Sequence, residues 1–221
     1  MRYEMKKIVR AGEREFRDMG WLQTHWLFSF GDYYDPNNLR HGSLRVFNDD
    51  VVQAKTGFGT HPHSEMEIIS VILSGEMEHR DSMCNTMILA EGDVQRMSAG
   101  TGLTHSEKNE AEKPVAFFQI WIEPDTKGLQ PSYDIRHFNS EAFRNKLTLF
   151  AANGAEDSVV SLNTEAKLFR GCWETGFTEK YVTGQDRAIF VYMVEGSAMV
   201  NGELLGPRDQ LRLSGKDKEE M

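Results

Sequence analysis

Cysteine is scarce in this chain, with only Cys84 and Cys172 among 221 residues. The two lie far apart and form no Cys-x-x-Cys pair, so neither a disulfide framework nor a thiolate zinc site is expected, and a reducing cytoplasm is the expected compartment. Long apolar runs are also missing, and the first 20 residues are rich in Lys, Arg and Glu. The sequence therefore predicts neither a transmembrane span nor a secretory signal.

An excess of positive charge is missing too. The formal net charge is −9, and no cluster of Lys and Arg stands out. Because an acidic surface repels phosphate backbones, direct binding to nucleic acid is not expected. The length suits one large domain or two of about 100 residues, and a chain of this size folds without needing disulfides or a metal.

Short apolar runs bounded by turn-forming residues recur along the chain. Three of them are rich in β-branched and aromatic residues, namely 68–73, 115–122 and 189–194. Such runs are typical of buried strands. The best helix candidate is short, at 141–147, with Asn139 or Ser140 as its N-terminal cap. The sequence predicts an all-β fold.

An internal repeat organises the chain. The segment 71–77 (VILSGEM) matches 192–198 (YMVEGSA), and 92–98 (GDVQRMS) matches 208–214 (RDQLRLS). The spacing differs by five residues, which fall in the intervening hairpin; in the second copy Asn201-Gly202 favours a tight type I′ turn. Two matches in the same order predict two similar β-domains in tandem.

The segment 123–132, with Pro124, Gly128 and Pro131, is interpreted as the linker. The expected domains are 1–130 and 131–221. Only seven residues follow Ser214, whereas the first copy continues for about 25 residues after Ser98. Either the second domain lacks closing strands at its C-terminal end or another segment supplies them, and the N-terminal stretch is a candidate. An uncovered sheet edge would favour self-association.

Two clusters of side chains point to metal chemistry. His61 and His63 are two residues apart, as are His105 and Glu107. In an extended strand such residues share a face, so adjacent strands would bring three imidazoles and a carboxylate together. These donors suit a redox metal with open positions. The alternative is that each pair is an ordinary surface or core feature, but two pairs in one repeat unit favour a metal site.

Other residues are interpreted more simply. Glu65 and Glu67 continue the alternation after His63. His79 is expected to be a satisfied surface or cavity residue. The positions in the second copy that correspond to His61, His63 and Glu67 are Val182, Gly184 and Ala188, so no second metal site is expected. Four apolar residues are interpreted as core, with the wall of a pocket as the alternative: Met66, Ile68, Met97 and Phe118.

The same motifs resemble a known family. The pattern Gly59-Thr-His61-Pro-His63-(x)3-Glu67, with Gly92-(x)5-Ser98-Ala-Gly100 and His105-(x)3-Asn109, resembles the two halves of the cupin signature. More narrowly, FGTHPHSEMEIISVILSGEMEHRDSM and EGDVQRMSAGTGLTHSE resemble pirins, in particular the bacterial quercetin 2,3-dioxygenase type. The resemblance is close over about 20–125 and looser beyond.

The resemblance implies a bicupin of two jelly-roll barrels, with one metal ion in the first. By the pirin pattern the ligands are His61, His63, His105 and Glu107. Other cupins take a carboxylate from the first motif, which makes Glu67 the alternative ligand. Iron(II) is the first candidate for the divalent ion, with nickel, copper, manganese, cobalt and zinc as alternatives. Glu107 is the candidate catalytic residue, as a general base or as a ligand only.

The function implied is a metal-dependent dioxygenase that opens the ring of a flavonol such as quercetin, so the expected partners are an aromatic small molecule and dioxygen. Two alternatives stay open, because a fold and a metal do not determine the chemistry. One is a metal-binding regulator that partners transcription factors, and the other is a cupin enzyme with another substrate. A protein partner and either a monomer or a dimer are compatible with the sequence, and no membrane contact is expected.

Overall fold

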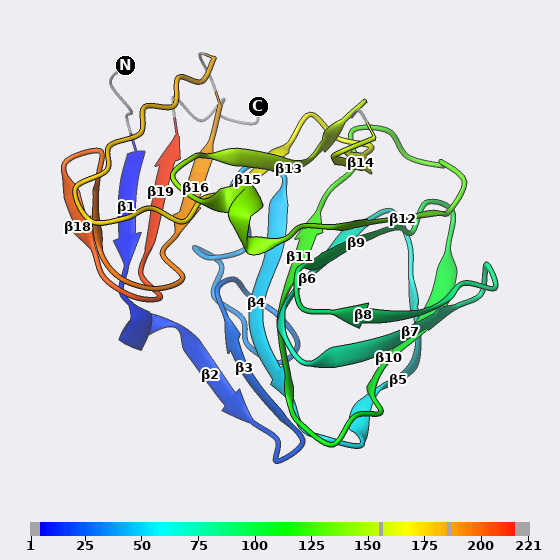
Figure 1. Ribbon diagram of the computed structural model, residues 1–221. Helices are drawn as coiled ribbons and strands as arrows, with labels where there is room; N and C mark the ends of the chain where they lie inside the picture. The colour runs from blue at the N-terminus through cyan, green and yellow to red at the C-terminus, as the bar shows by residue number, and fades with distance from the viewer. Residues whose placement is uncertain (1–4, 155–156, 185–186, 215–221) are drawn as a thin grey trace.

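The computed structural model describes residues 5–154, 157–184 and 187–214 of the chain, and it consists almost entirely of strands (Figure 1). The largest sheet has seven strands, in this order: β12 (Ser132–His137), β9 (Asp93–Ser98), β6 (Glu67–Ser74), β11 (Val115–Ile122), β4 (Leu44–Val52), β3 (Leu22–Trp26) and β2 (Glu15–Asp18). A four-stranded sheet accompanies it, in the order β5 (Thr56–His63), β10 (Leu103–Asn109), β7 (Glu76–Asp81) and β8 (Thr86–Ala90). The predicted strands at 68–73 and 115–122 are β6 and β11.

These two sheets form the first cupin-type domain and enclose its interior between them. The central strands β6, β9 and β11 are buried on both faces. This explains why β6 and β11 are nearly continuous apolar runs, whereas β9 buries the polar residues Gln95 and Arg96. The inner face of β6 meets β10 directly, because Ser70 Oγ donates to Glu107 Oε1 at 3.2 Å. The interior of this domain is therefore partly polar.

The rest of the chain forms three smaller sheets. Their strands are β1 (Met5–Val9), β19 (Gln210–Ser214) and β16 (Ile189–Tyr192) in the first, β14 (Val160–Leu162), β13 (Thr148–Asn153) and β15 (Lys167–Arg170) in the second, and β17 (Ala198–Val200) with β18 (Glu203–Leu205) in the third. The helices of the described residues are two short 3-10 turns, Ala11–Glu13 and Ser140–Phe143. The predicted cap Asn139 accepts from Ala142 N at 3.0 Å, but the helix is shorter than expected, and Asn145 follows with a positive φ of 52°.

The internal repeat is visible in the backbone. Gly75 and Gly196 occupy matching turns with φ of 80° and 69°. Asn201 and Gly202 both have positive φ, as the type I′ turn between β17 and β18 requires. The two copies also share a side-chain bond, because Asp93 accepts from Ala90 N and Asp209 accepts from Gly206 N. Two cupin-type domains in tandem are therefore confirmed.

The N-terminal stretch supplies a strand to the second domain, as the sequence suggested. β1 pairs antiparallel with β19, from Met5 opposite Ser214 to Val9 opposite Gln210 (Figure 1). Asp209, next to β19, holds the chain just after the end of β1. Its carboxylate accepts from Arg10 Nη1 at 2.7 Å and from Ala11 N at 2.8 Å. The strand at 5–9 therefore belongs with residues more than 200 positions away.

Asp209→Ala is expected to lower the free energy of unfolding by roughly 2–3 kcal/mol, because the substitution leaves the part-buried backbone N–H groups of Ala11 and Gly206 without their acceptor. Urea unfolding of the wild type and the variant measures the difference. The matched control is Glu203→Ala, which removes the ion pair with Lys6 on the same sheet edge; an exposed pair is worth about 0–1 kcal/mol. Equal losses in the two variants would contradict the account.

Two arginines at equivalent positions of the repeat connect the domains. Arg96, on β9, donates from Nε to Ser161 O in the second domain at 2.7 Å. Arg212, on β19, donates from Nη2 to Leu27 O in the first domain at 2.8 Å, and its guanidinium lies 4.1 Å from the centre of the Phe28 ring. The largest apolar cluster also spans both domains. The domains are thus joined by a shared core and by reciprocal hydrogen bonds.

The domain boundary between residues 130 and 131 stays a prediction. Two strands pair with strands on the other side of this boundary. β12 lies beyond it yet pairs with β9 of the first domain, and β1 lies before it yet pairs with β19. Within the described ranges, no helix is long and apolar enough to span a membrane.

Candidate metal centre

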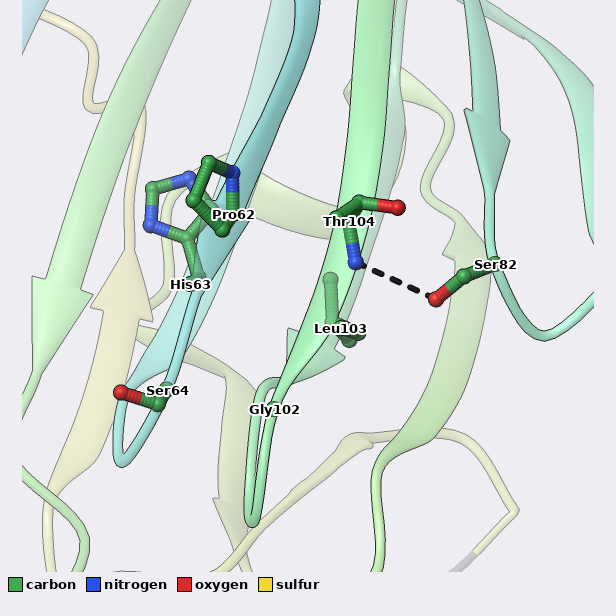
Figure 2. Close-up of a pocket in the computed structure, with 7 residues that line it drawn as sticks. All are labelled: Pro62, His63, Ser64, Ser82, Gly102, Leu103 and Thr104. Atoms are coloured by element: carbon green, nitrogen blue, oxygen red, sulfur yellow. Dashed lines mark hydrogen bonds between the residues drawn. The ribbon is translucent and has the colours of Figure 1, made fainter.

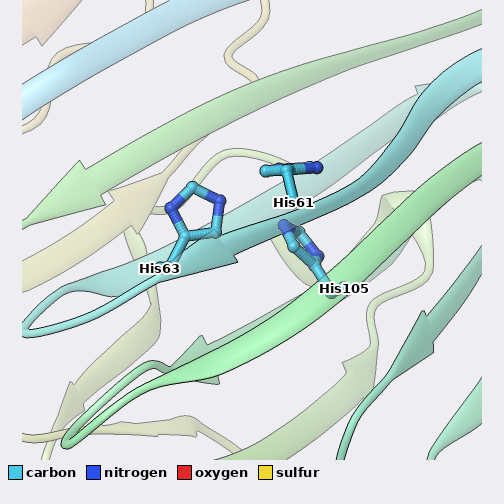
Figure 3. Close-up of side chains that lie close together, drawn as sticks. All are labelled: His61, His63 and His105. Atoms are coloured by element: carbon cyan, nitrogen blue, oxygen red, sulfur yellow. The ribbon is translucent and has the colours of Figure 1, made fainter.

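Three imidazoles from two neighbouring strands converge in the first domain. His61 and His63 come from β5, and His105 comes from β10 (Figure 3). Their ligand atoms all lie within 4.8 Å of one another. On β5 the exposed Pro62 separates the two half-buried histidines, so the predicted alternation holds. The strand register places His105 directly opposite His61.

The ring nitrogens of the three imidazoles are available to a metal ion. Nδ1 of His61 lies 2.8 Å from Gly59 O, which leaves Nε2 of the same ring available. His105 is 1% exposed, and neither of its ring nitrogens has a hydrogen-bond partner in the protein. Burial, with a smaller contribution from the neighbouring imidazoles, lowers the pKa of His63 to about 4 and that of His105 to about 3. Both rings are therefore neutral at pH 7, as metal ligands must be.

Glu107 is held in place by the opposite sheet. It is 2% exposed, and its two carboxylate oxygens accept from Ser70 Oγ at 3.2 Å and from Gln119 Nε2 at 2.9 Å. Behind these residues, Gln95 Nε2 donates to Ser70 Oγ, and Tyr133 OH donates to Gln95 Oε1. Each carboxylate oxygen keeps a lone pair for a metal ion or a proton. Glu107 forms its own close group with His105 and His79, with ligand atoms within 4.8 Å.

Glu67, the alternative ligand, points elsewhere. Its carboxylate accepts from the backbone N and the side-chain Nδ2 of Asn163 in the second domain, at 3.2 and 3.3 Å. The expected alternation breaks before it, because Glu65 has a positive φ of 52° in the turn between β5 and β6. Glu65 is also away from the histidines, where it accepts from Gly128 N. The structure therefore favours Glu107 over Glu67.

His79 is the residue that the sequence interpretation undervalued. It is fully buried, and register places it opposite Glu107 on the neighbouring strand β7. The signal that could have found it is His79-x-Asp81, which places both side chains on the inward face of a strand. The sequence interpretation also missed four polar residues. Ser70 and Gln119 are single polar residues within apolar runs, and Gln95 and Tyr133 lie in strands of mixed polarity in which no local pattern marks them.

An apolar wall adjoins the histidines. Trp121 lies against His63, with ring centres 4.9 Å apart, and its buried Nε1 has no hydrogen-bond partner. The surrounding cluster contains Ile68, Met97, Ala99 and Leu103, with Met66, Met83 and Trp121 packed against it. Met66, Ile68 and Met97 thus belong to core that borders the site. Phe118 instead packs at the domain interface, against Phe47 and Tyr192.

An open depression lies at this end of the domain (Figure 2). It has a volume of about 620 Å³, within the range of small-molecule sites. Its lining residues are Pro62, His63, Ser64, Ser82, Gly102, Leu103 and Thr104. His63 and Leu103 belong both to this depression and to the surroundings of the metal centre. Two of the lining residues are joined by a hydrogen bond, in which Thr104 N donates to Ser82 Oγ at 3.1 Å (Figure 2).

Gln119→Leu is expected to weaken metal binding by roughly 10–100-fold, because outer partners of ligands orient them and are typically worth that much. Competition titration with a chromophoric chelator measures the affinity. Gln95→Leu is the matched control, since it removes a buried amide that does not touch Glu107. Both variants should lose stability, but only Gln119→Leu should lose affinity. Equal affinities would show that Glu107 needs no such support.

The fold and the side chains together define a bicupin whose first domain carries a group that can bind a metal ion. A model of the pirin family matches residues 9–122, and a model described as the quercetinase C-terminal cupin domain matches residues 149–221. A pirin-like protein from Caulobacter vibrioides is 39% identical over 193 residues, which cover 87% of this chain and 83% of that protein. A quercetin 2,3-dioxygenase from Escherichia coli is 37% identical over 207 residues, covering 93% and 88%.

Solved structures agree. The bacterial pirin YhhW from Escherichia coli, solved in complex with nickel(II), matches with a TM-score of 0.81 and 34% identity, covering 96% of this chain and 91% of that one. The chain belongs to the pirin family.

Proposed function

We propose that this protein is a metal-dependent dioxygenase that opens the ring of a flavonol such as quercetin with dioxygen. The observation that carries the proposal is the convergence of three imidazoles around His105, whose two buried nitrogens have no protein partner. Leaving such groups unpaired costs about 1–3 kcal/mol each, so the donor set fits a metal ion. Relatives named quercetin 2,3-dioxygenase support the substrate class.

The residues that would hold the ion are His61, His63, His105 and Glu107. Imidazole and carboxylate suit iron(II), which is our first candidate, and they also accept nickel, copper, manganese, cobalt and zinc. When bound, the ion supplies Lewis acidity, which lowers the pKa of a flavonol hydroxyl. Since the two cysteines are free and exposed, the reducing cytoplasm is the compartment that we propose.

The chain's own residues account for the recognition of an aromatic substrate. Leu103 lines the open depression beside His63 and offers an aromatic ring an apolar contact, with Ile68 and Met97 packed behind it. Glu107, fixed by Ser70 and Gln119, has lone pairs free to accept the hydroxyl proton, so we assign it the role of general base.

Oxygen uptake and loss of quercetin absorbance test the proposal, with protein reconstituted separately with each of the six metals. Metal-dependent turnover that disappears in His63→Ala is the expected result. Stoichiometric metal binding without oxygen uptake would contradict a dioxygenase and favour a regulatory protein with a protein partner. Oxygen-independent conversion of a substrate would favour another cupin enzyme.

A further inference from the structure

A second group of ligand atoms lies deeper in the first domain than the three converging imidazoles. His79, His105 and Glu107 have ligand atoms within 4.8 Å of one another, and none of these residues is more than 2% exposed. Two neighbouring strands place them, because β10 pairs with β7 so that Glu107 lies opposite His79. His61 and His63, by contrast, are half-buried residues on the other side of β10.

His79 has the surroundings of a metal ligand. Its Nε2 lies 3.2 Å from Asp81 Oδ2, while its Nδ1 is buried without a hydrogen-bond partner. Histidine ligands usually donate their second ring N–H to a carboxylate or a carbonyl, which leaves the other nitrogen to face the metal. Asp81 is itself fixed, since its two oxygens accept from Met83 N, from Asn85 N and from Asn85 Nδ2.

His105 lies between the two groups. Its ring centre is 4.4 Å from that of His61, 5.0 Å from that of His63 and 5.4 Å from that of His79. Both of its nitrogens lack a partner in the protein, so either can face a metal ion. On the far side of His79, the Tyr133 ring lies 5.2 Å away and closes the group.

We propose that His79, His105 and Glu107 form an inner position for a divalent transition-metal ion, and that His79 is a ligand there. Because the inner position shares His105 and Glu107 with the ligands assigned above, the two positions are alternatives for one ion. An ion at the inner position is enclosed by buried side chains. The inference builds on the metal-binding part of the proposed function and does not depend on flavonol turnover.

Cobalt(II) binding separates the two positions. The wild type, His61→Ala/His63→Ala and His61→Ala/His63→Ala/His79→Gln are titrated with Co²⁺ and followed by the visible absorption of the bound ion and by competition with a chelator. Glutamine at position 79 keeps a polar group near the Asp81 carboxylate and places no nitrogen at the position of Nδ1. Circular dichroism confirms that each variant is folded, and His137→Ala in place of His79→Gln is the matched control.

The inference predicts that the double variant still binds one Co²⁺, more weakly than the wild type, and that adding His79→Gln abolishes this binding while adding His137→Ala does not. A folded double variant that binds no Co²⁺ would overturn it, as would a triple variant that binds as well as the double. A wild type without metal binding would overturn both this inference and the proposed function. Metal binding without turnover would count against the dioxygenase alone.

Discussion

His105→Ala is expected to abolish metal binding and every metal-dependent activity. His105 is the imidazole common to both groups of ligand atoms, and it is the most deeply buried of the three converging histidines. Because the loss of an outer partner alone typically weakens metal affinity 10–100-fold, the loss of this ligand is expected to exceed roughly 100-fold. Isothermal titration with nickel or cobalt measures the affinity, and oxygen uptake measures the activity.

The control for His105→Ala is His137→Ala. His137 is exposed, and its Nδ1 lies 2.8 Å from Asp93 Oδ1 on the surface of the same domain. Its loss removes one imidazole without touching the centre, so metal affinity should be unchanged. Wild-type affinity in a folded His105→Ala protein would contradict the assignment of the centre.

Asp50→Asn is expected to stabilise the metal-free protein at alkaline pH. Asp50 lies on β4, is 3% exposed, and has one carboxylate oxygen, Oδ1, without a partner. Burial, with smaller contributions from the negative charges of Asp49 and Glu107, raises its pKa to about 7. The folded-state pKa therefore lies above the ordinary value of 3.8, so the folded protein retains a proton that the unfolded chain releases.

Because the folded-state pKa of Asp50 is raised, the protein loses stability as the pH rises. The contribution of Asp50 to stability is greatest below pH 4 and is lost as the pH rises towards 7. Since a single group changes the free energy of unfolding by at most about 1.4 kcal/mol per pH unit, the total loss is up to roughly 4 kcal/mol. Asparagine carries no charge at any of these values, so Asp50→Asn should exceed the wild type by about 2–4 kcal/mol at pH 8.

Urea unfolding of the metal-free proteins between pH 5 and pH 8 measures this difference. Asp32→Asn is the matched control, because the Asp32 side chain is 79% exposed. The gap between Asp50→Asn and the wild type should widen as the pH rises, whereas the control should run parallel to the wild type. A gap that stays constant with pH would mean that Asp50 does not titrate in this range.

The strands and the repeat could be predicted because they depend on local patterns. The runs at 68–73 and 115–122 are apolar on both faces, and Gly75, Gly196 and Asn201-Gly202 mark turns that need positive φ. The spacing of His61 and His63 identified two of the three converging imidazoles for the same reason. Alternation along one strand places both on one face, whatever the rest of the fold does.

The remaining features depend on register and on contacts between distant segments. In the sequence, Glu67 continues the two-residue alternation of His61 and His63. In the structure, the turn at Glu65 changes the direction of the chain, and the Glu67 carboxylate binds Asn163 instead. His79 lies far in sequence from the candidate ligands, and only the pairing of β7 with β10 brings it to Glu107. Gln119 donates a hydrogen bond to Glu107 because one sheet packs on the other. No local sequence pattern predicts that contact.

A crystal structure of the nickel-loaded protein, with an anomalous difference map at the nickel edge, tests the central claim most directly. The account predicts a strong peak in the first domain within coordination distance of His105, and no peak in the second domain, where Val182, Gly184 and Ala188 stand at the positions that match His61, His63 and Glu67. A strong peak away from His105, or no peak in fully loaded protein, would contradict it.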